Sequence, residues 1–175
     1  FLELNSISKG ILAADEMIKA ADITLIAARP SCPGKYQILI TGEVSSVEAA
    51  LDAGQAASAA NVIDRLILPR IHPQIVEAIN LSSAPERLRA LGVMEFFSVT
   101  AAIMAADAAA KAADITLLEI RLGTGIGGKS FVTMTGDVSA VTASVDAGMK
   151  SAEDSGMILD SVVIAHPDPE LYRHL

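Results

Sequence analysis

The feature of this 175-residue sequence that most limits its possible folds is an internal repeat. The heptapeptide KAADITL occupies both 19–25 and 111–117, and at the same spacing Glu3 corresponds to Glu95. Further on, GKYQILITGEVSSVEAALDAG (34–54) aligns with GKSFVTMTGDVSAVTASVDAG (128–148), so the second copy carries two more residues in the preceding loop. A repeat of about 90 residues is longer than a solenoid unit, which measures about 20–50 residues, and it predicts two domains.

Each copy shows the hydrophobic periods of a mixed α/β unit. In the first copy, apolar or β-branched runs predict strands at 1–4, 23–28, 35–41 and 66–68. Helical spacing predicts a helix at 7–21, and Ser45 with Glu48 forms a capping box that opens a second helix. The second copy repeats this pattern over 93–164. The order β-α-β-β-α-β is that of the ferredoxin-like split βαβ arrangement, so we expect an α/β (α+β) chain of two tandem ferredoxin-like domains.

The join between the copies has the composition of a linker. A short helix is expected at 73–79, and the stretch that follows holds Pro85 and several charged residues. We therefore expect a first domain at 1–80, a linker at 81–91 and a second domain at 92–175.

The stretch GTGIGGKS (123–130) matches the phosphate-loop pattern G-x-x-x-x-G-K-[ST]. A phosphate loop requires a helix directly after it, because the helix N-terminus supplies the N–H donors. Here the next residues, FVTMTGDV, have the pattern of a strand, and the first copy keeps only the Gly-Lys pair. The glycines are better explained by a tight loop between two strands. A nucleotide-hydrolysing enzyme would need ATP binding that depends on Lys129, and we expect neither this binding nor any enzymatic activity.

Charge and cysteine content limit the possible partners and compartment. With 21 acidic and 13 basic residues the net charge is −8, which argues against a nucleic-acid binder. The single cysteine, Cys32, precludes an internal disulfide and fits a reducing compartment. No apolar run is long enough for a membrane span and no secretory signal pattern is present, so we expect a cytoplasmic protein.

Several short motifs occur in the same order in both copies: a strand Glu, a helix Lys, the Gly-Lys pair, a G-[DE]-V turn and a D-A-G helix end. This set resembles the bacterial microcompartment shell domain in its unpermuted order, over nearly the whole chain. Among tandem-domain shell proteins, the chain is most similar to the propanediol-utilisation type with a cysteine in the first-copy loop. The resemblance implies a homotrimer that mimics a hexamer, packs beside other shell proteins and surrounds a central pore.

The resemblance also implies which residues line that pore. They are Ser31, Cys32 and Pro33 in the first copy and Gly125, Ile126 and Gly127 in the second. In the resembled type, three loop cysteines hold one [4Fe–4S] cluster per trimer for electron transfer across the shell, with a flavin or iron–sulfur reductase as a possible partner. Independently, a turn containing Pro33 is a poor place for a buried core thiol. A free pore thiol and another metal remain alternatives for Cys32.

Other recurring residues have structural interpretations. Lys19, Lys111 and Arg70 match tile-edge residues of the resembled family, and solvated side chains are the alternative for both lysines. His72 and His166 each precede a proline and are expected to be loop or capping residues. Duplicated carboxylates far apart in the unit lack the close pairing that acid–base catalysis requires.

Two further functions are open at this point. The pore could admit metabolites without any cluster, since Ser31, Gly125 and Gly127 are small. Alternatively, the chain could be a ferredoxin-like regulator that oligomerises around a small ligand.

Overall fold

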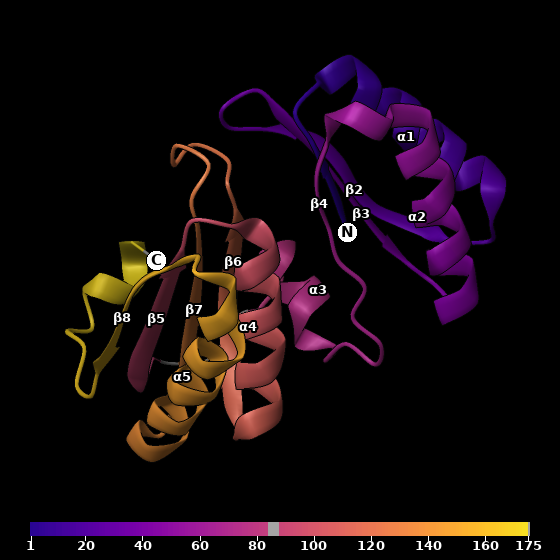
Figure 1. The fold of residues 1–175 in the computed structure, drawn as a ribbon. Coiled ribbons are helices and arrows are strands. Elements are labelled where there is room, and N and C mark those ends of the chain that lie inside the picture. The colour runs from indigo at the N-terminus through magenta and orange to yellow at the C-terminus, as the bar shows by residue number, and fades with distance from the viewer. Residues whose placement is uncertain (84–87, 175) are drawn as a thin grey trace. The chain divides into compact units, whose positions relative to one another are not determined.

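The computed structural model describes residues 1–83 and 88–174. The chain divides into two compact units, Phe1–Pro69 and Arg70–Leu175 (Figure 1). Each unit contains a four-stranded antiparallel sheet with two long helices against it.

The first unit follows the expected order β-α-β-β-α-β. Its elements are β1 (Leu2–Leu4), α1 (Ile7–Ala20), β2 (Thr24–Ser31), β3 (Lys35–Thr41), α2 (Val44–Ser58), a 3₁₀ turn at Ala59–Asn61 and β4 (Val62–Arg65). The strand order in the sheet is β2-β3-β1-β4, so β2 and β4 are the edge strands.

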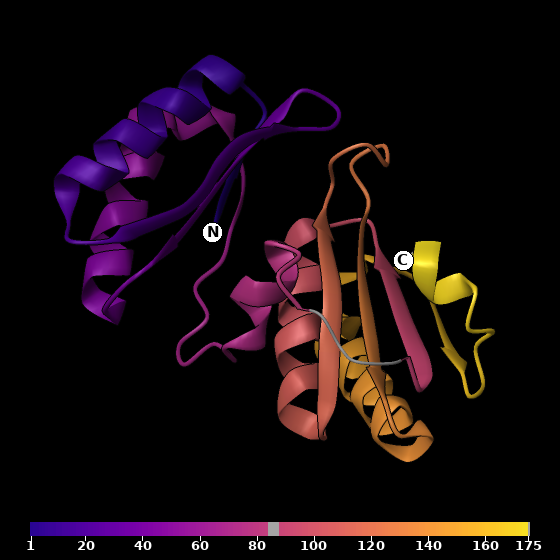
Figure 2. The ribbon, with the colours of Figure 1, turned by 180° about the vertical axis from the view of Figure 1, so that it is seen from behind.

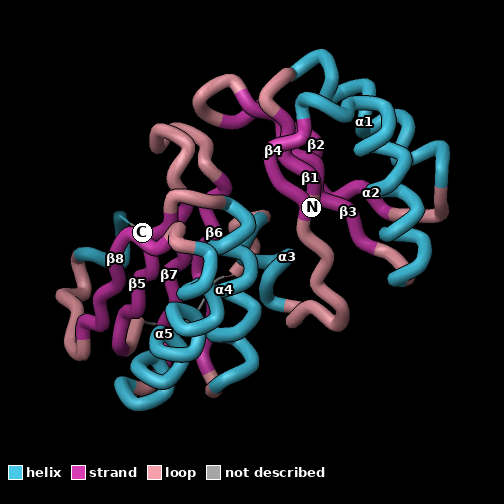
Figure 3. Tube along the Cα trace, in the orientation of Figure 1, coloured by secondary structure: helices cyan, strands magenta, loops and turns pink. Residues whose placement is uncertain are grey.

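The second unit repeats this order after one additional short helix. Its elements are α3 (Gln74–Ile79), β5 (Ala90–Phe96), α4 (Val99–Ala112), β6 (Ile115–Leu122), β7 (Ser130–Gly136), α5 (Val138–Ala152), a 3₁₀ turn at Glu153–Ser155, β8 (Ile158–Ile164) and a final 3₁₀ turn at Leu171–His174. The sheet order is β6-β7-β5-β8. Figure 2 shows the strands of this sheet in front of α4 and α5, and Figure 3 shows both helices on one side of the sheet. The two tandem ferredoxin-like domains are therefore confirmed.

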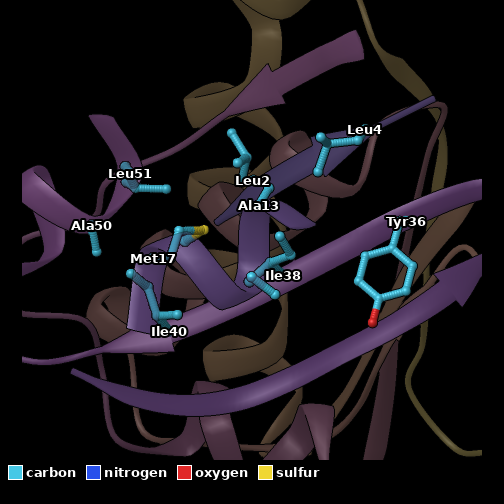
Figure 4. Close-up of a cluster of buried hydrophobic side chains, with 10 residues drawn as sticks. Leu2, Leu4, Ala13, Met17, Tyr36, Ile38, Ile40, Ala50 and Leu51 are labelled. Carbon is cyan, nitrogen blue, oxygen red and sulfur yellow. The ribbon is translucent and has the colours of Figure 1, made fainter. Parts of the chain in front are cut away.

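Small residues let the helices approach the sheet and each other closely. In the first unit, Met17 of α1, Ile38 of β3 and Leu51 of α2 are fully buried in one cluster (Figure 4). Gly54 of α2 leaves room for this cluster, because a Cβ there would lie 2.6 Å from Met17 Cγ. Gly148 of α5 makes room for packing in the second unit, because a Cβ there would lie 2.7 Å from Met94 Sδ. The D-A-G motif therefore marks the close packing of α2 and α5 against the neighbouring helix and the sheet of their own unit.

The helix and strand boundaries differ from the sequence expectation in two places. Helix α2 begins at Val44 with Glu43 as its N-cap and no side-chain cap bond, so the capping box at Ser45 was wrong. The last strand of the first unit lies at Val62–Arg65 rather than 66–68. Its position is set by backbone pairing of Arg65 with Leu2 of β1, which an apolar run cannot reveal.

The short helix α3 forms where the sequence predicts one, but it packs against β6 and α4 of the second unit. The residues 70–80, which we expected in the first domain, are therefore part of the second compact unit. Residues 84–87 of the expected linker lie outside the described part of the chain.

Candidate functional site

The loop between β2 and β3 carries the single cysteine at the tip of a tight hairpin. Gly34 adopts φ +84°, and its N–H donates to the Ser31 carbonyl at 3.0 Å. The peptide between Cys32 and Pro33 is cis. Cys32 is partly exposed and Pro33 is exposed, whereas Ser31 is buried. The thiol is thus presented from the hairpin rather than packed into the core.

A buried polar network connects this hairpin to the sheet. Gln37 Nε2 donates to Ser31 Oγ at 3.0 Å and to Glu3 Oε1 at 3.1 Å. Lys35 Nζ donates to Glu3 Oε2 at 2.9 Å. Ser31, Gln37 and Glu3 are all nearly inaccessible to solvent. Since buried polar groups are costly when unpaired, these bonds hold Ser31 and hence the adjacent Cys32 in place.

The sequence reasoning missed Gln37 and Lys35 as supports of the loop. Strand alternation could have indicated them, because residues 35 and 37 are two apart and therefore lie on the same face of β3. The observed register places Gln37 opposite Glu3 and Lys35 opposite Ser31. Glu3, expected to be structural, is the acceptor for both Gln37 and Lys35.

The glycine-rich loop between β6 and β7 forms an extended turn. Its four glycines, Gly123, Gly125, Gly127 and Gly128, all have positive φ. The Lys129 N–H donates to the Ile126 carbonyl at 3.3 Å, and Lys129 Nζ donates to Glu95 Oε1 at 2.6 Å. Strand β7 follows directly, as the sequence predicts, so the loop does not run into a helix N-terminus. Gly125 and Gly127 are exposed and Ile126 is partly exposed.

The three expected edge residues lie at the surface. Lys19 and Lys111 are at the ends of α1 and α4, and they pair with Asp15 and Asp107 one turn earlier. The hydrogen bond to Asp15 raises the pKa of Lys19. Arg70 is exposed, with φ 54°, at the start of the second unit.

His72 and His166 occupy loop positions, as expected. The His72 N–H donates to Asp107 Oδ1 at 2.8 Å, and His166 is exposed after β8. Within the described residues, no group of three or more His, Cys, Asp or Glu side chains could hold a metal ion. Among the helices described, none is both long and apolar enough to span a membrane.

Comparison with known proteins agrees with the fold and the repeat. The BMC domain matches residues 1–71 and again 90–167. The chain is 36% identical over 174 residues to the bacterial microcompartment shell protein PduT of Citrobacter freundii, covering 99% of this chain and 95% of that protein. It is 38% identical over 87 residues to the shell protein PduA of the same organism, covering 49% of this chain and 90% of PduA.

A solved structure gives the same result for the whole chain. The crystal structure of a microcompartments protein from Desulfitobacterium hafniense DCB superimposes with a TM-score of 0.94 at 49% identity, covering 98% of this chain and 96% of that one. These matches decide between the shell-protein and regulator interpretations in favour of the shell protein, whose role is structural rather than catalytic. The chain therefore belongs to the BMC domain family, and it is a shell protein of a bacterial microcompartment built from two BMC domains in tandem.

Proposed function

We propose that three copies of the chain form a pseudohexameric tile, and that Cys32 of each copy holds one shared [4Fe–4S] cluster at the central pore. The observation that carries this proposal is the position of Cys32 at a hairpin tip. The buried hydrogen bonds of Gln37 to Ser31 and Glu3 hold that hairpin on the sheet. A closed trimer brings three equivalent loops together on its symmetry axis.

The residues fit such a cluster. Cys32 is a free, partly exposed thiol, and thiolate sulfur is the usual ligand of iron–sulfur clusters. One chain supplies a single thiolate, and three chains supply three. The fourth iron would then need a ligand from outside the protein or an open position. When bound, such a cluster supplies one-electron transfer between a reductant on one face of the tile and an oxidant on the other.

The surrounding side chains would hold the thiol ligand in place. Gln37 fixes Ser31, and Glu3 with Lys35 fixes Gln37, so the ligand-bearing loop is organised before iron arrives. Preorganisation of this kind lowers the entropic cost of binding. A flavin or iron–sulfur reductase docked near the pore would deliver electrons, and Lys19, Lys111 and Arg70 would contact neighbouring shell proteins.

Iron and acid-labile sulfide, measured on anaerobically purified protein, test this proposal. We expect about four irons and four sulfides per trimer, consistent with a cubane cluster. The Cys32→Ser variant should form the same trimer without iron. Iron that persists in Cys32→Ser would refute Cys32 as the ligand.

A gating pore without a cluster is the second candidate. It is favoured by the exposed glycines of the β6–β7 loop, where a Cβ at Gly125 or Gly127 would meet nothing within 4 Å. A trimer that contains no iron with or without Cys32 would support this function instead.

A further inference from the structure

The two units carry an arginine at the same place in their sheets, but its neighbours differ. In the second unit, Arg121 of β6 donates through its Nε to the side chain of Glu119 on the same strand. The guanidinium of Arg121 also lies over the ring of Phe131, 5.8 Å from the ring centroid. The positive charge of this arginine is therefore neutralised inside the unit that carries it.

The first unit lacks both of these neighbours. Its arginine is Arg29 of β2, and the residue two positions earlier is Ala27, whose side chain cannot accept a hydrogen bond. On the adjacent strand β3, Gln37 takes the place of the second unit's phenylalanine and lies opposite Arg29. Within residues 1–83 and 88–174 the Arg29 side chain forms no ion pair, and its buried Nε has no hydrogen-bond acceptor. The buried Gln37 Oε1 likewise has no donor there.

The acidic side chains on this row of the sheet are distant or already bonded to other residues. The row runs across β2, β3, β1 and β4 and consists of Arg29, Gln37, Glu3 and Asp64. Because neighbouring strands are about 4.8 Å apart, the backbone at Glu3 lies about 10 Å from that at Arg29, and the backbone at Asp64 about 14 Å. Both carboxylate oxygens of Glu3 accept hydrogen bonds, from Lys35 and Gln37. This row therefore leaves the charge of Arg29 unneutralised.

A guanidinium without an acidic partner can recognise a carboxylate from outside the protein. Its planar set of N–H donors matches the two oxygens of a carboxylate and can bind both at once. Arg29 is partly exposed, so a small ligand can approach its side chain. An unpaired donor is costly in a buried position, so a ligand that accepts from the guanidinium would stabilise this part of the sheet. The position therefore fits a carboxylate that does for Arg29 what Glu119 does for Arg121.

The same arginine lies close to the thiol along β2. Arg29 and Cys32 are separated by two residues, and a strand advances about 3.3 Å per residue, so about 10 Å separates their backbones. Gln37, opposite Arg29, donates to Ser31 Oγ at 3.0 Å and so connects this row of the sheet to the hairpin. The whole chain has a net charge of −8, which makes an unneutralised cation here a local exception. Such a charge attracts anions toward the cysteine loop.

We propose that Arg29 binds the carboxylate of a small organic acid and holds it beside Cys32. In the second unit the carboxylate is part of the chain, and in the first unit the ligand provides it. The inference goes beyond the proposed shell tile. It does not depend on the proposed cluster, because the site consists of residues of one unit and needs no iron.

An NMR titration with sodium acetate tests the binding. Protein labelled with ¹⁵N-arginine gives signals from its Nε–H groups, and comparison with Arg29→Lys assigns the signal of Arg29. At constant ionic strength this signal should shift saturably with acetate, and it should not shift with acetamide, which is of similar size but uncharged. Ala27→Glu supplies the carboxylate that the second unit has, so it should weaken acetate binding about tenfold or more. Its uncharged match, Ala27→Gln, should bind acetate like the parent.

The position of the charge beside the thiol is tested by labelling iron-free protein. Cys32 is the single cysteine, so its reaction rates with an anionic and a cationic methanethiosulfonate report on this place alone. At low ionic strength, Arg29→Gln should lower the ratio of the anionic to the cationic rate about fourfold. Arg29→Lys keeps the charge and should keep the ratio.

Each unexpected outcome has a separate meaning. An Arg29 signal that acetate does not move, or that moves no more than the other arginine signals, would overturn the binding site. An unchanged rate ratio in Arg29→Gln would overturn its placement beside the thiol. Undiminished acetate binding in Ala27→Glu would contradict the correspondence between the ligand and Glu119. A protein that binds no iron would refute the proposed cluster and leave all of these measurements unaffected, so the two proposals fail separately.

Discussion

The two copies share one fold, yet they stabilise their hairpin loops by different means. Both keep the strand Glu and the loop Lys, paired as Glu3–Lys35 and Glu95–Lys129. In the first copy Gln37 extends the pair into a buried network, and the Glu3 side chain is 5% exposed. In the second copy the corresponding residue is Phe131, which lies under Arg121 at 5.8 Å, and the Glu95 side chain is 36% exposed.

This difference matches the loops that the two copies carry. The cysteine loop is short and is held by the hydrogen bond from Gln37 of β3 to Ser31. The glycine-rich loop obtains its shape from positive-φ backbone positions. The two copies therefore share a scaffold, while one loop is tied to the sheet by hydrogen bonds next to a thiol and the other is two residues longer and rich in glycine.

The largest expected difference between the copies concerns their helix faces. Ile103→Asp buries a charge in a position with no partner, so the second unit should lose about 4 kcal/mol or more of stability and fail to fold. Ile11→Asp changes a side chain that is 56% exposed, so its circular dichroism spectrum and its stability to urea should stay close to those of the parent. Equal loss of structure in both variants would contradict the contrast between the faces.

A smaller difference is expected at the helix glycines. In Gly148→Ala the new methyl group would meet the Ala105 backbone carbonyl at 2.8 Å, which cannot move aside. In Gly54→Ala the closest atoms belong to the flexible Met17 side chain. Urea unfolding should therefore show a loss of about 3 kcal/mol for Gly148→Ala and about 1 kcal/mol for Gly54→Ala. The opposite ranking would show that α2 and not α5 is the tighter contact.

Substitutions of the residues that support the two loops should differ more in their effect on the reactivity of Cys32 than in their effect on stability. Gln37→Leu removes two hydrogen bonds from a buried network and should cost about 1–3 kcal/mol. Iron-free protein carrying this change should react severalfold faster with a thiol reagent at Cys32. Phe131→Leu, the matched change in the second copy, should leave that rate unaltered. Equal rates in the two variants and the parent would mean that the network does not position the thiol.

The smallest effect concerns Lys19, whose pKa the hydrogen bond to Asp15 raises above the ordinary value of 10.5. Because the folded-state pKa is the higher one, this stabilisation is fully present below pH 10.5 and is lost as the pH rises through the folded value. In Asp15→Asn the pKa of Lys19, followed by an NMR titration, should fall toward 10.5. A pKa that does not change would assign the shift to another group.

Local patterns predicted much of this molecule. The helix at 7–21 and the strand at 35–41 follow from periodicity, and the residues after Ser130 identify a strand where a phosphate loop would need a helix. The features that local patterns did not predict depend on contacts between segments far apart in the sequence. The start of β4 depends on its partner β1, and α3 is a helix whose neighbours no local pattern could indicate. Gln37 was missed because a polar residue in a strand usually faces solvent, whereas here it faces Glu3.

The packing of α3 within the second unit has a consequence for assembly. The segment 70–79 follows the first copy without a break, so the packing of α3 forms within a single chain and does not depend on the protein concentration. In the proposed tile, the equilibrium concentration of a ring of three such chains would vary with the third power of the free chain concentration, whereas that of a ring of six separate domains would vary with the sixth power of the free domain concentration. The proposed tile of fused domains should therefore persist on dilution that would disperse a ring of single domains.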